Sequence, residues 1–267
     1  MSLAAFQQAT SDLVASPDLC RRLQRDPQSV LSRYELSTRD QHRLIDLVQQ
    51  RGMSINCTLY RFNRITPLYT LLPLTNFVMG ESFIHEAELF WESFRDSDPR
   101  FTQEVDRFGD FLIQRLHRGE IQNEFAEEII CFELATNELR FAQREEILGE
   151  LGNASLGSGK TRALQLHPLV RLVTFRHEPA KLLRLLKDRR PQPYQLMKDR
   201  FWVLLDVLGE ELRVRRIEPQ LGEILERIAG SGITLSEEDS EALLEAGMVV
   251  RSADQALEPP PNVHMPL

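Results

Sequence analysis

The spacing of the apolar residues changes once along this chain, and the change constrains the fold class. From Leu3 to about Glu150, apolar residues recur at the spacing of amphipathic helices. After that point, "PLVRLVTFRH" and "DRFWVLLDVLGEELRVRRI" carry the β-branched and aromatic runs typical of strands. Four glycines, two serines and an asparagine lie between Gly149 and Gly159, which favours a linker. We therefore expect an α+β protein with an N-terminal helical bundle at 1–150, a flexible linker at 151–165 and a second domain at 166–251.

The second domain is predicted to be winged-helix-like, with three strands followed by two helices, the order β-β-β-α-α. Gly209–Glu210 separates two strand-like runs, which indicates a hairpin. Pro219 is a favourable first residue for one helix, and Ser236 with Asp239 can form a capping box for the next. The remaining expectations are a strand in 168–177, hairpin strands at Phe201–Val207 and Leu212–Ile217, a short strand at Met248–Arg251, and a disordered, Pro-rich, acidic tail at 252–267.

Charge is distributed unevenly along the chain, whose formal net charge is −8. There are 16 basic and 24 acidic residues through Gly159, 14 basic and 6 acidic from Lys160 to Arg216, and 2 basic and 10 acidic after that. A basic band thus lies between two acidic blocks. Such a band is compatible with a solvated surface, with an acidic peptide or with a phosphate backbone as partner.

The three cysteines, Cys20, Cys57 and Cys131, are far apart and have no metal-ligand spacing, so we expect buried free thiols. The N-terminal residues "MSLAAFQQATSD" lack the basic and apolar regions of a signal peptide, and no uncharged apolar run approaches the length of a membrane span. These observations predict a cytoplasmic protein without a membrane partner.

The stretch "GSGKT" resembles part of a nucleotide-binding P-loop, but its context differs. The first glycine position of that motif is occupied by Ala154, and Pro168 would cut short the helix that must follow. Asp206 imitates the acid that would hold Mg²⁺, yet it lies beside the hairpin turn, where we expect a solvated carboxylate. We interpret Lys160 and Thr161 as linker residues. A P-loop enzyme, the alternative, would lose ATP binding in Lys160→Ala.

Catalytic and metal-binding signatures are missing from the sequence. "SFIHEAELF" lacks the second histidine of a zinc-protease motif, and no histidine stands in the context of a catalytic triad. The acidic residues of "NEFAEEIICFELATNEL" have no histidine partner, so we expect a solvated or interfacial face. That set comprises Glu124, Glu127, Glu128, Glu133 and Glu138. The sequence therefore predicts a binding protein without a cofactor or metal of its own, rather than an enzyme.

The hairpin strand in "ELRVRRI" can present a basic row. Strand alternation places Leu212, Val214 and Arg216 on one face and Arg213, Arg215 and Ile217 on the other. If this strand is a sheet edge, it can accept an extended peptide by β-augmentation; the alternative is a strand covered by the chain's own bundle. A winged-helix DNA-binding regulator is the other candidate. Against it, "EEDSEALLEAG" would enter the groove with five acids and no base.

Two segments resemble a known family. "LRVRRIEPQLGEILERIAGSGITLSEED" is similar to the strand–helix part of PqqD-like peptide-recognition elements, which serve the biosynthesis of ribosomally made, post-translationally modified peptides. "LTNFVMGESFIHEAELFWESFRDSDPRFTQEVDRFGDFLIQRL" and the following "FAEEIICFELATNEL" resemble the helical domain of HvfC/MbnC/TglI-type partner proteins of multinuclear non-haem iron-dependent oxidative enzymes. The resemblance spans about Leu74 to Arg251.

This resemblance implies a non-catalytic, required subunit of a heterodimer. It would bind a ribosomally made precursor peptide and present a residue, usually Cys, to the enzyme, which holds the iron. The acidic bundle helices would face that enzyme, and no nucleic acid would be bound. The residues implied to contact the peptide are Leu212, Arg213, Val214, Arg215, Arg216, Leu243, Leu244 and Met248.

Overall fold

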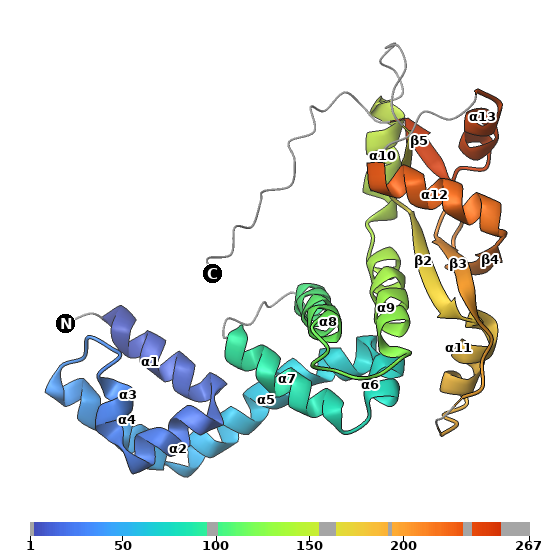
Figure 1. Cartoon of the computed structure of the whole chain (residues 1–267). Helices are drawn as coiled ribbons and strands as arrows, with labels where there is room; N and C mark the ends of the chain where they lie inside the picture. The colour runs from blue at the N-terminus through green and yellow to red at the C-terminus, as the bar shows by residue number, and fades with distance from the viewer. Residues whose placement is uncertain (1–2, 95–100, 155–163, 192–193, 232–236, 252–267) are drawn as a thin grey trace. The chain divides into compact units, whose positions relative to one another are not determined.

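The computed structural model describes residues 3–94, 101–154, 164–191, 194–231 and 237–251 (Figure 1). The chain is an α+β protein in which helices predominate and the sheets are small and antiparallel. It divides into two compact units, Met1–Leu134 and Ala135–Leu267, and the division falls inside helix α9 (Ala126–Arg140). Each unit is described separately below.

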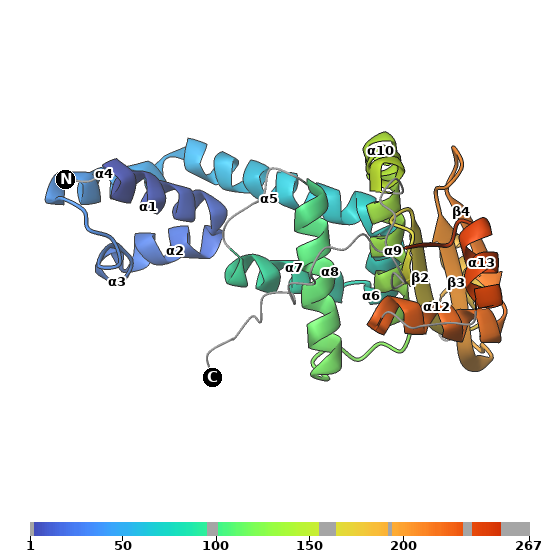
Figure 2. The same cartoon turned by 90° about the horizontal axis from the view of Figure 1, so that it is seen from above.

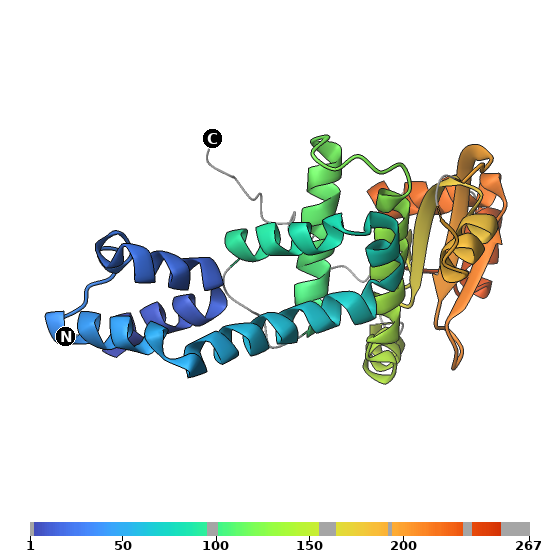
Figure 3. The same ribbon diagram turned by 90° about the horizontal axis from the view of Figure 1, so that it is seen from below.

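Among the described residues of the first unit, the regular elements are all helices and no strand occurs. Figure 3 shows α5 as a long helix that connects the group formed by α1–α4 to α6–α8. The helices are α1 (Leu3–Ala15), α2 (Pro17–Arg25), α3 (Pro27–Leu31), α4 (Thr38–Gln49), α5 (Arg51–Leu71), α6 (Pro73–Met79), α7 (Ser82–Ser93), α8 (Phe101–His117) and the start of α9.

Local sequence explains why the N-terminal helices are short. The Ser16 hydroxyl accepts a hydrogen bond from the Leu19 N–H (3.2 Å), and Pro17 fills the first helical position of α2. Asp26 in the same way accepts from the Ser29 N–H at the start of α3. Their apolar faces, together with those of α1, α4 and the start of α5, form one core, which includes Leu13, Leu23, Val30, Leu44 and Val48.

Aromatic side chains form the interior around α7 and α8. Phe83 and Phe108 meet edge to face with ring centroids 5.4 Å apart, and Phe90 lies 5.3 Å from Phe108. All three are almost fully buried. Such pairs stabilise a core beyond the area they bury, which positions α7 against α8.

The second unit is built on a three-stranded antiparallel sheet with the order β2-β3-β4. A separate two-stranded sheet joins β1 to β5. Its elements after α9 are α10 (Arg144–Ala154), β1 (Leu164–Leu166), β2 (Val170–His177), α11 (Pro179–Lys187), β3 (Lys198–Asp206), β4 (Arg213–Ile217), α12 (Pro219–Ser231), α13 (Glu237–Glu245) and β5 (Val249–Arg251). Helix α11 and strand β1 were not predicted from the sequence.

Helix α12 packs across one face of the three-stranded sheet (Figures 1 and 2). Leu225 and Ile228 of α12 join Leu204 of β3 in a core that also contains residues of β1, α13 and β5. The approach is close at Gly222, where an added Cβ would lie 2.4 Å from the Trp202 ring. Glycine at this position therefore lets the helix reach the sheet.

Several expectations fall at the limits of the described residues. In the predicted linker, 151–154 belong to α10 and 164–165 to β1, and 155–163, which include Lys160 and Thr161, lie outside the described residues. The same holds for Ser236 and for the expected tail at 252–267.

In the described portion of the chain, none of the helices has the length and apolar character required to cross a membrane.

Candidate functional site

Strand β4 is an edge of the three-stranded sheet. It pairs with β3 through five residue pairs, from Trp202–Ile217 to Asp206–Arg213. On its other side, no strand from the described residues is hydrogen-bonded to it. Alternate N–H and C=O groups of β4 consequently point away from the sheet, as the β-augmentation hypothesis requires.

The register assigns each side chain of β4 to a face. Ile217 lies opposite Trp202 and packs with the core under α12, so Arg213 and Arg215, at alternate positions, share the α12 side. Val214 and Arg216 lie on the opposite face. Every residue of β4 from Arg213 to Arg216 is exposed, and the Val214 side chain is 46% exposed. An aliphatic side chain between three arginines is therefore open to solvent.

Two of these arginines are held by neighbouring groups. Arg215 Nη2 donates a hydrogen bond to Asp206 Oδ2 at 3.1 Å. The Arg216 guanidinium lies 4.8 Å from the centre of the Phe201 ring, a cation–π contact. These contacts restrict the side chains before any ligand arrives, so less conformational entropy is lost on binding.

Asp206 differs from the prediction. We expected a solvated carboxylate near the turn, but Asp206 is 0% exposed. Asp206 belongs to the central strand β3, where it lies between Val170 of β2 and Arg213 of β4. Asp206 Oδ2 accepts from Arg215, whereas Asp206 Oδ1 has no hydrogen-bond donor within the described residues. A buried carboxylate thus anchors an exposed cation.

The structure places the other predicted contact residues in different surroundings. Leu212 precedes β4 and is half-buried. Leu243 is 7% exposed and belongs to the core shared with Leu204, while Leu244 and Met248 pack against that core. These three side chains pack in or against the core of the unit, so they are not candidate ligand contacts.

A second group beside the edge was not identified from the sequence. Both carboxylate oxygens of Glu226 on α12 accept from Arg200 Nη2, at 2.6 and 2.7 Å, and the Arg200 guanidinium lies 5.0 Å from the Trp202 ring centre. Arg200 lies two residues before Trp202 on β3, on the α12 side. The segment "RFW" indicates that Arg200 and Trp202 share one face of β3, because they are two residues apart. Their partner Glu226 on α12 is 26 residues from Arg200, so no local sequence pattern could identify it.

The predicted acidic set, of which Glu124 is exposed and precedes α9 while the other four lie on α9, is not uniformly solvated. Glu133 accepts from the backbone N–H groups of Leu74 (2.7 Å) and Thr75 (2.8 Å), and Glu128 is also buried. Glu133 therefore satisfies open donors at the N-terminus of α6. Glu138 forms an ion pair with Arg171, and Glu127 lies 2.8 Å from His117 Nε2. Of the predicted solvated or interfacial face, the solvated part does not hold for Glu128 and Glu133, because their side chains are buried within the unit.

Two of the three cysteines and His167 are buried. Cys20 and Cys57 are 8% and 5% exposed, as predicted, whereas Cys131 is only half-buried. His167 Nδ1 accepts from the Leu169 N–H at 3.0 Å, and burial lowers the pKa of His167. Among the residues described, no group of three or more His, Cys, Asp or Glu side chains could hold a metal ion.

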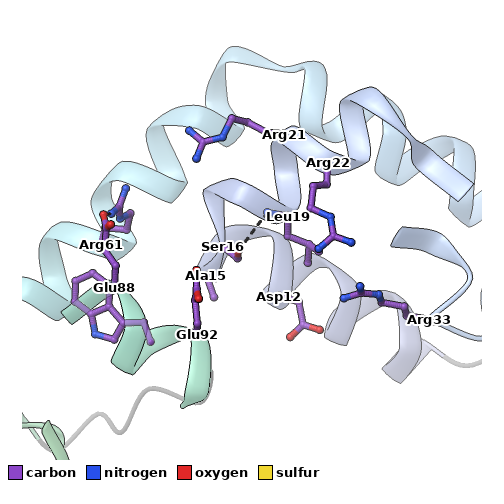
Figure 4. A pocket seen from close by; sticks show the side chains of 11 residues that line it. Asp12, Ala15, Ser16, Leu19, Arg21, Arg22, Arg33, Arg61, Glu88 and Glu92 are labelled. Carbon is purple, nitrogen blue, oxygen red and sulfur yellow. Dashed lines mark hydrogen bonds and ion pairs between the residues drawn. The ribbon is translucent and has the colours of Figure 1, made fainter. Parts of the chain in front are cut away.

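The first unit also contains a pocket of about 470 Å³ (Figure 4). Arg22, Arg33 and Asp12 gather at one end of it, and Arg61 forms an ion pair with Glu88 at the other. The Tyr34 hydroxyl donates to Asp12 at 2.7 Å. Both arginines and carboxylates line this pocket, so it offers less charge selectivity than the arginine row of β4.

Helix α13 bears on the DNA-binding alternative. Its sequence, Glu237–Glu245, has no basic residue, and Glu241 and Glu245 are exposed. These carboxylates would repel a phosphate backbone.

The geometry of β4 therefore combines an open backbone edge with a cationic row and a solvent-exposed aliphatic side chain.

No protein-family model matches the sequence, and a search of curated proteins found no match.

Proposed function

We propose that this chain is a non-catalytic recognition subunit that binds an extended peptide along β4 and presents it to a separate iron-dependent oxidative enzyme. The observation that carries the proposal is that β4 pairs with a strand on one side only among the described residues, and that its exposed residues include Arg213, Arg215 and Arg216. Main-chain hydrogen bonds would supply affinity, and the side chains of β4 would supply selectivity.

The resemblance to the HvfC/MbnC/TglI-type partner proteins supports the second half of this proposal. In that family, the iron ligands belong to the enzyme subunit and the partner carries the recognition element. The bound molecule would be a ribosomally made precursor peptide in which a residue, usually Cys, is oxidised by the enzyme. A micromolar complex, equivalent to about −8 kcal/mol, suits a subunit that must release its modified peptide.

Selection from a random dodecapeptide library tests the peptide-binding part without knowledge of the natural ligand. Synthetic versions of the selected peptides are expected to slow amide hydrogen exchange in Arg213–Ile217. A DNA duplex serves as the control probe and is expected not to bind. Absence of any selected peptide, or protection confined to other segments, would overturn the proposal.

Backbone methylation tests the binding mode. In an added strand, alternate peptide residues direct their N–H groups toward β4 and away from it. Peptides N-methylated at the odd or at the even residues should therefore differ, with one set losing binding and the other retaining it. Equal affinity of the two sets contradicts strand addition.

Purification of the tagged full chain from its native cells tests the enzyme partner. We expect a stoichiometric second polypeptide that contains more than one iron atom. A partner without iron would contradict the proposed presentation to an iron enzyme. It would not affect the peptide-binding part of the proposal, which the library selection tests separately.

A further inference from the structure

The two faces of β4 favour different side chains in a neighbouring guest strand. Residues directly opposite one another in adjacent strands share a face, with Cβ atoms about 4.5–5.5 Å apart. A guest residue opposite Arg213 or Arg215 would lie on the α12 side, and the residue between them would lie beside Val214 on the other face. The guest pattern can therefore be derived residue by residue.

The α12 side of the edge favours guest carboxylates. Arg213 and Arg215 are two residues apart and exposed there. Asp206 is the acidic residue of β3 beside them, and it engages Arg215 through Nη2. A guanidinium has five N–H donors, so Arg215 retains donors for a second acceptor. Arg200 on the same face is already paired with Glu226, which leaves the two β4 arginines for the guest.

The other face of the edge favours an aliphatic guest residue. Val214 lies opposite the buried Leu205 and is itself 46% exposed. The neighbouring Arg216 is held over the Phe201 ring. An aliphatic side chain beside Val214 would remove apolar surface from water, whereas a charged one would lose hydration there.

Resting on the proposed function, we infer that the guest is recognised through an acidic–aliphatic–acidic triplet opposite Arg213–Val214–Arg215. The triplet is the same when read in either direction, so the inference holds for a parallel and for an antiparallel guest strand. The substrate class is consequently an acidic, strand-forming peptide segment.

Three seven-residue peptides, each acetylated and amidated, test the triplet. TTEVETT carries it, ETTVTTE has the same composition and net charge with the carboxylates three residues from valine, and TTQVQTT lacks the charges. Their affinities are measured by NMR titration of the β4 amides. We expect TTEVETT to bind about 10-fold tighter than either control, since each cross-strand charge pair contributes a few-fold. High salt should reduce this difference.

A matched pair of protein variants locates the effect. Arg215→Gln should weaken TTEVETT by about 3- to 5-fold and leave TTQVQTT unchanged. Lys187→Gln removes the same charge from an exposed position on α11 and should change the affinity for neither TTEVETT nor TTQVQTT. Trp202 fluorescence verifies that each variant retains the fold of this unit. If Arg215→Gln and Lys187→Gln weaken the binding of TTEVETT equally, the effect depends on the net charge of the protein and not on the position of Arg215. That result would overturn the inference.

The outcomes separate the inference from the proposed function. If TTEVETT and ETTVTTE bind β4 equally, or if library peptides protect β4 without containing the triplet, the inference fails and strand addition stands. If no peptide, selected or designed, protects β4, the proposed function itself fails.

Discussion

Individual charged residues in the interior are neutralised by specific partners. Arg64 on α5 donates to Glu104 on α8 at 2.6 Å, and their side chains are 5% and 6% exposed. Arg64 also donates to the Phe94 carbonyl oxygen (3.2 Å) and lies 5.4 Å from the Trp91 ring centre. The pair joins two helices at a buried point, so each charge depends on the other for neutralisation.

Removal of one member of this pair should be more damaging than removal of both. Arg64→Met leaves Glu104 as an uncompensated buried charge, and we expect a loss of about 3–5 kcal/mol in the free energy of unfolding. The double variant Arg64→Met/Glu104→Leu should recover most of that loss. Urea unfolding measures both values. A double variant as unstable as the single one would contradict this account.

The buried thiol pair gives stability a pH dependence. Cys20 and Cys57 have sulfur atoms 3.9 Å apart, and burial together with the neighbouring Cys57 raises the pKa of Cys20 to about 12, from an ordinary value of 9.0. The folded state therefore holds this proton more tightly than the unfolded state. The resulting stabilisation is complete below pH 9 and is lost as pH rises from 9 toward 12, by up to about 1.4 kcal/mol per pH unit.

Comparison with a variant isolates this effect. The difference in unfolding free energy between the unmodified chain and Cys20→Ala should shrink between pH 8 and pH 10. Val30→Ala, a substitution in the same core without a titrating group, should show a constant difference. A constant difference for Cys20→Ala as well would mean that its thiol is not protected from ionisation.

At the scale of elements, the contact of α12 with the sheet depends on one glycine. An alanine methyl at Gly222 would meet the rigid Trp202 ring at 2.4 Å, whereas Gly230, near the other end of the same helix, has nothing within 4 Å. Gly222→Ala should cost about 1–3 kcal/mol through overpacking. Gly230→Ala should gain up to about 1 kcal/mol from helix propensity. Similar effects at both positions would exclude a packing role for Gly222.

The elements that were predicted correctly have a strong local signal. Strand β3 contains the run Phe201–Leu205 of aromatic and aliphatic residues, β4 combines β-branched residues with arginines across a glycine-containing turn from it, and α12 begins at a proline. Strand β1 has three residues and pairs with β5 more than 80 positions later, so its existence depends on a non-local partner. Helix α11 did have a local signal, with Pro179 at its start and Leu182 and Leu186 on its buried side.

The sequence alone predicts the strand that forms the candidate site and some of its charged residues. The alternation along "RVRRI" is enough to place its arginines on two faces. The burial of Asp206 and the pairing of Arg200 with Glu226 depend on how α12 lies over the sheet, and this information is tertiary. The sequence also could not show that Leu243 is needed for the core.

At the scale of the whole molecule, the two tryptophans give one optical reporter to each compact unit. Trp91 lies in the first unit and Trp202 in the second. The Arg64 and Cys20 variants are therefore best followed in a Trp202→Phe background, and the Gly222 variant in a Trp91→Phe background. Each unfolding transition can then be assigned to the unit in which the substitution was made.

The side of β4 that pairs with no strand among the described residues also affects how the protein behaves at high concentration. An open strand edge can pair with the same edge of another copy, which is a common first step toward aggregation. Here two copies meeting edge to edge would bring Arg213, Arg215 and Arg216 of each against those of the other. Their mutual repulsion would oppose association between identical molecules and leave the edge open to the proposed acidic guest.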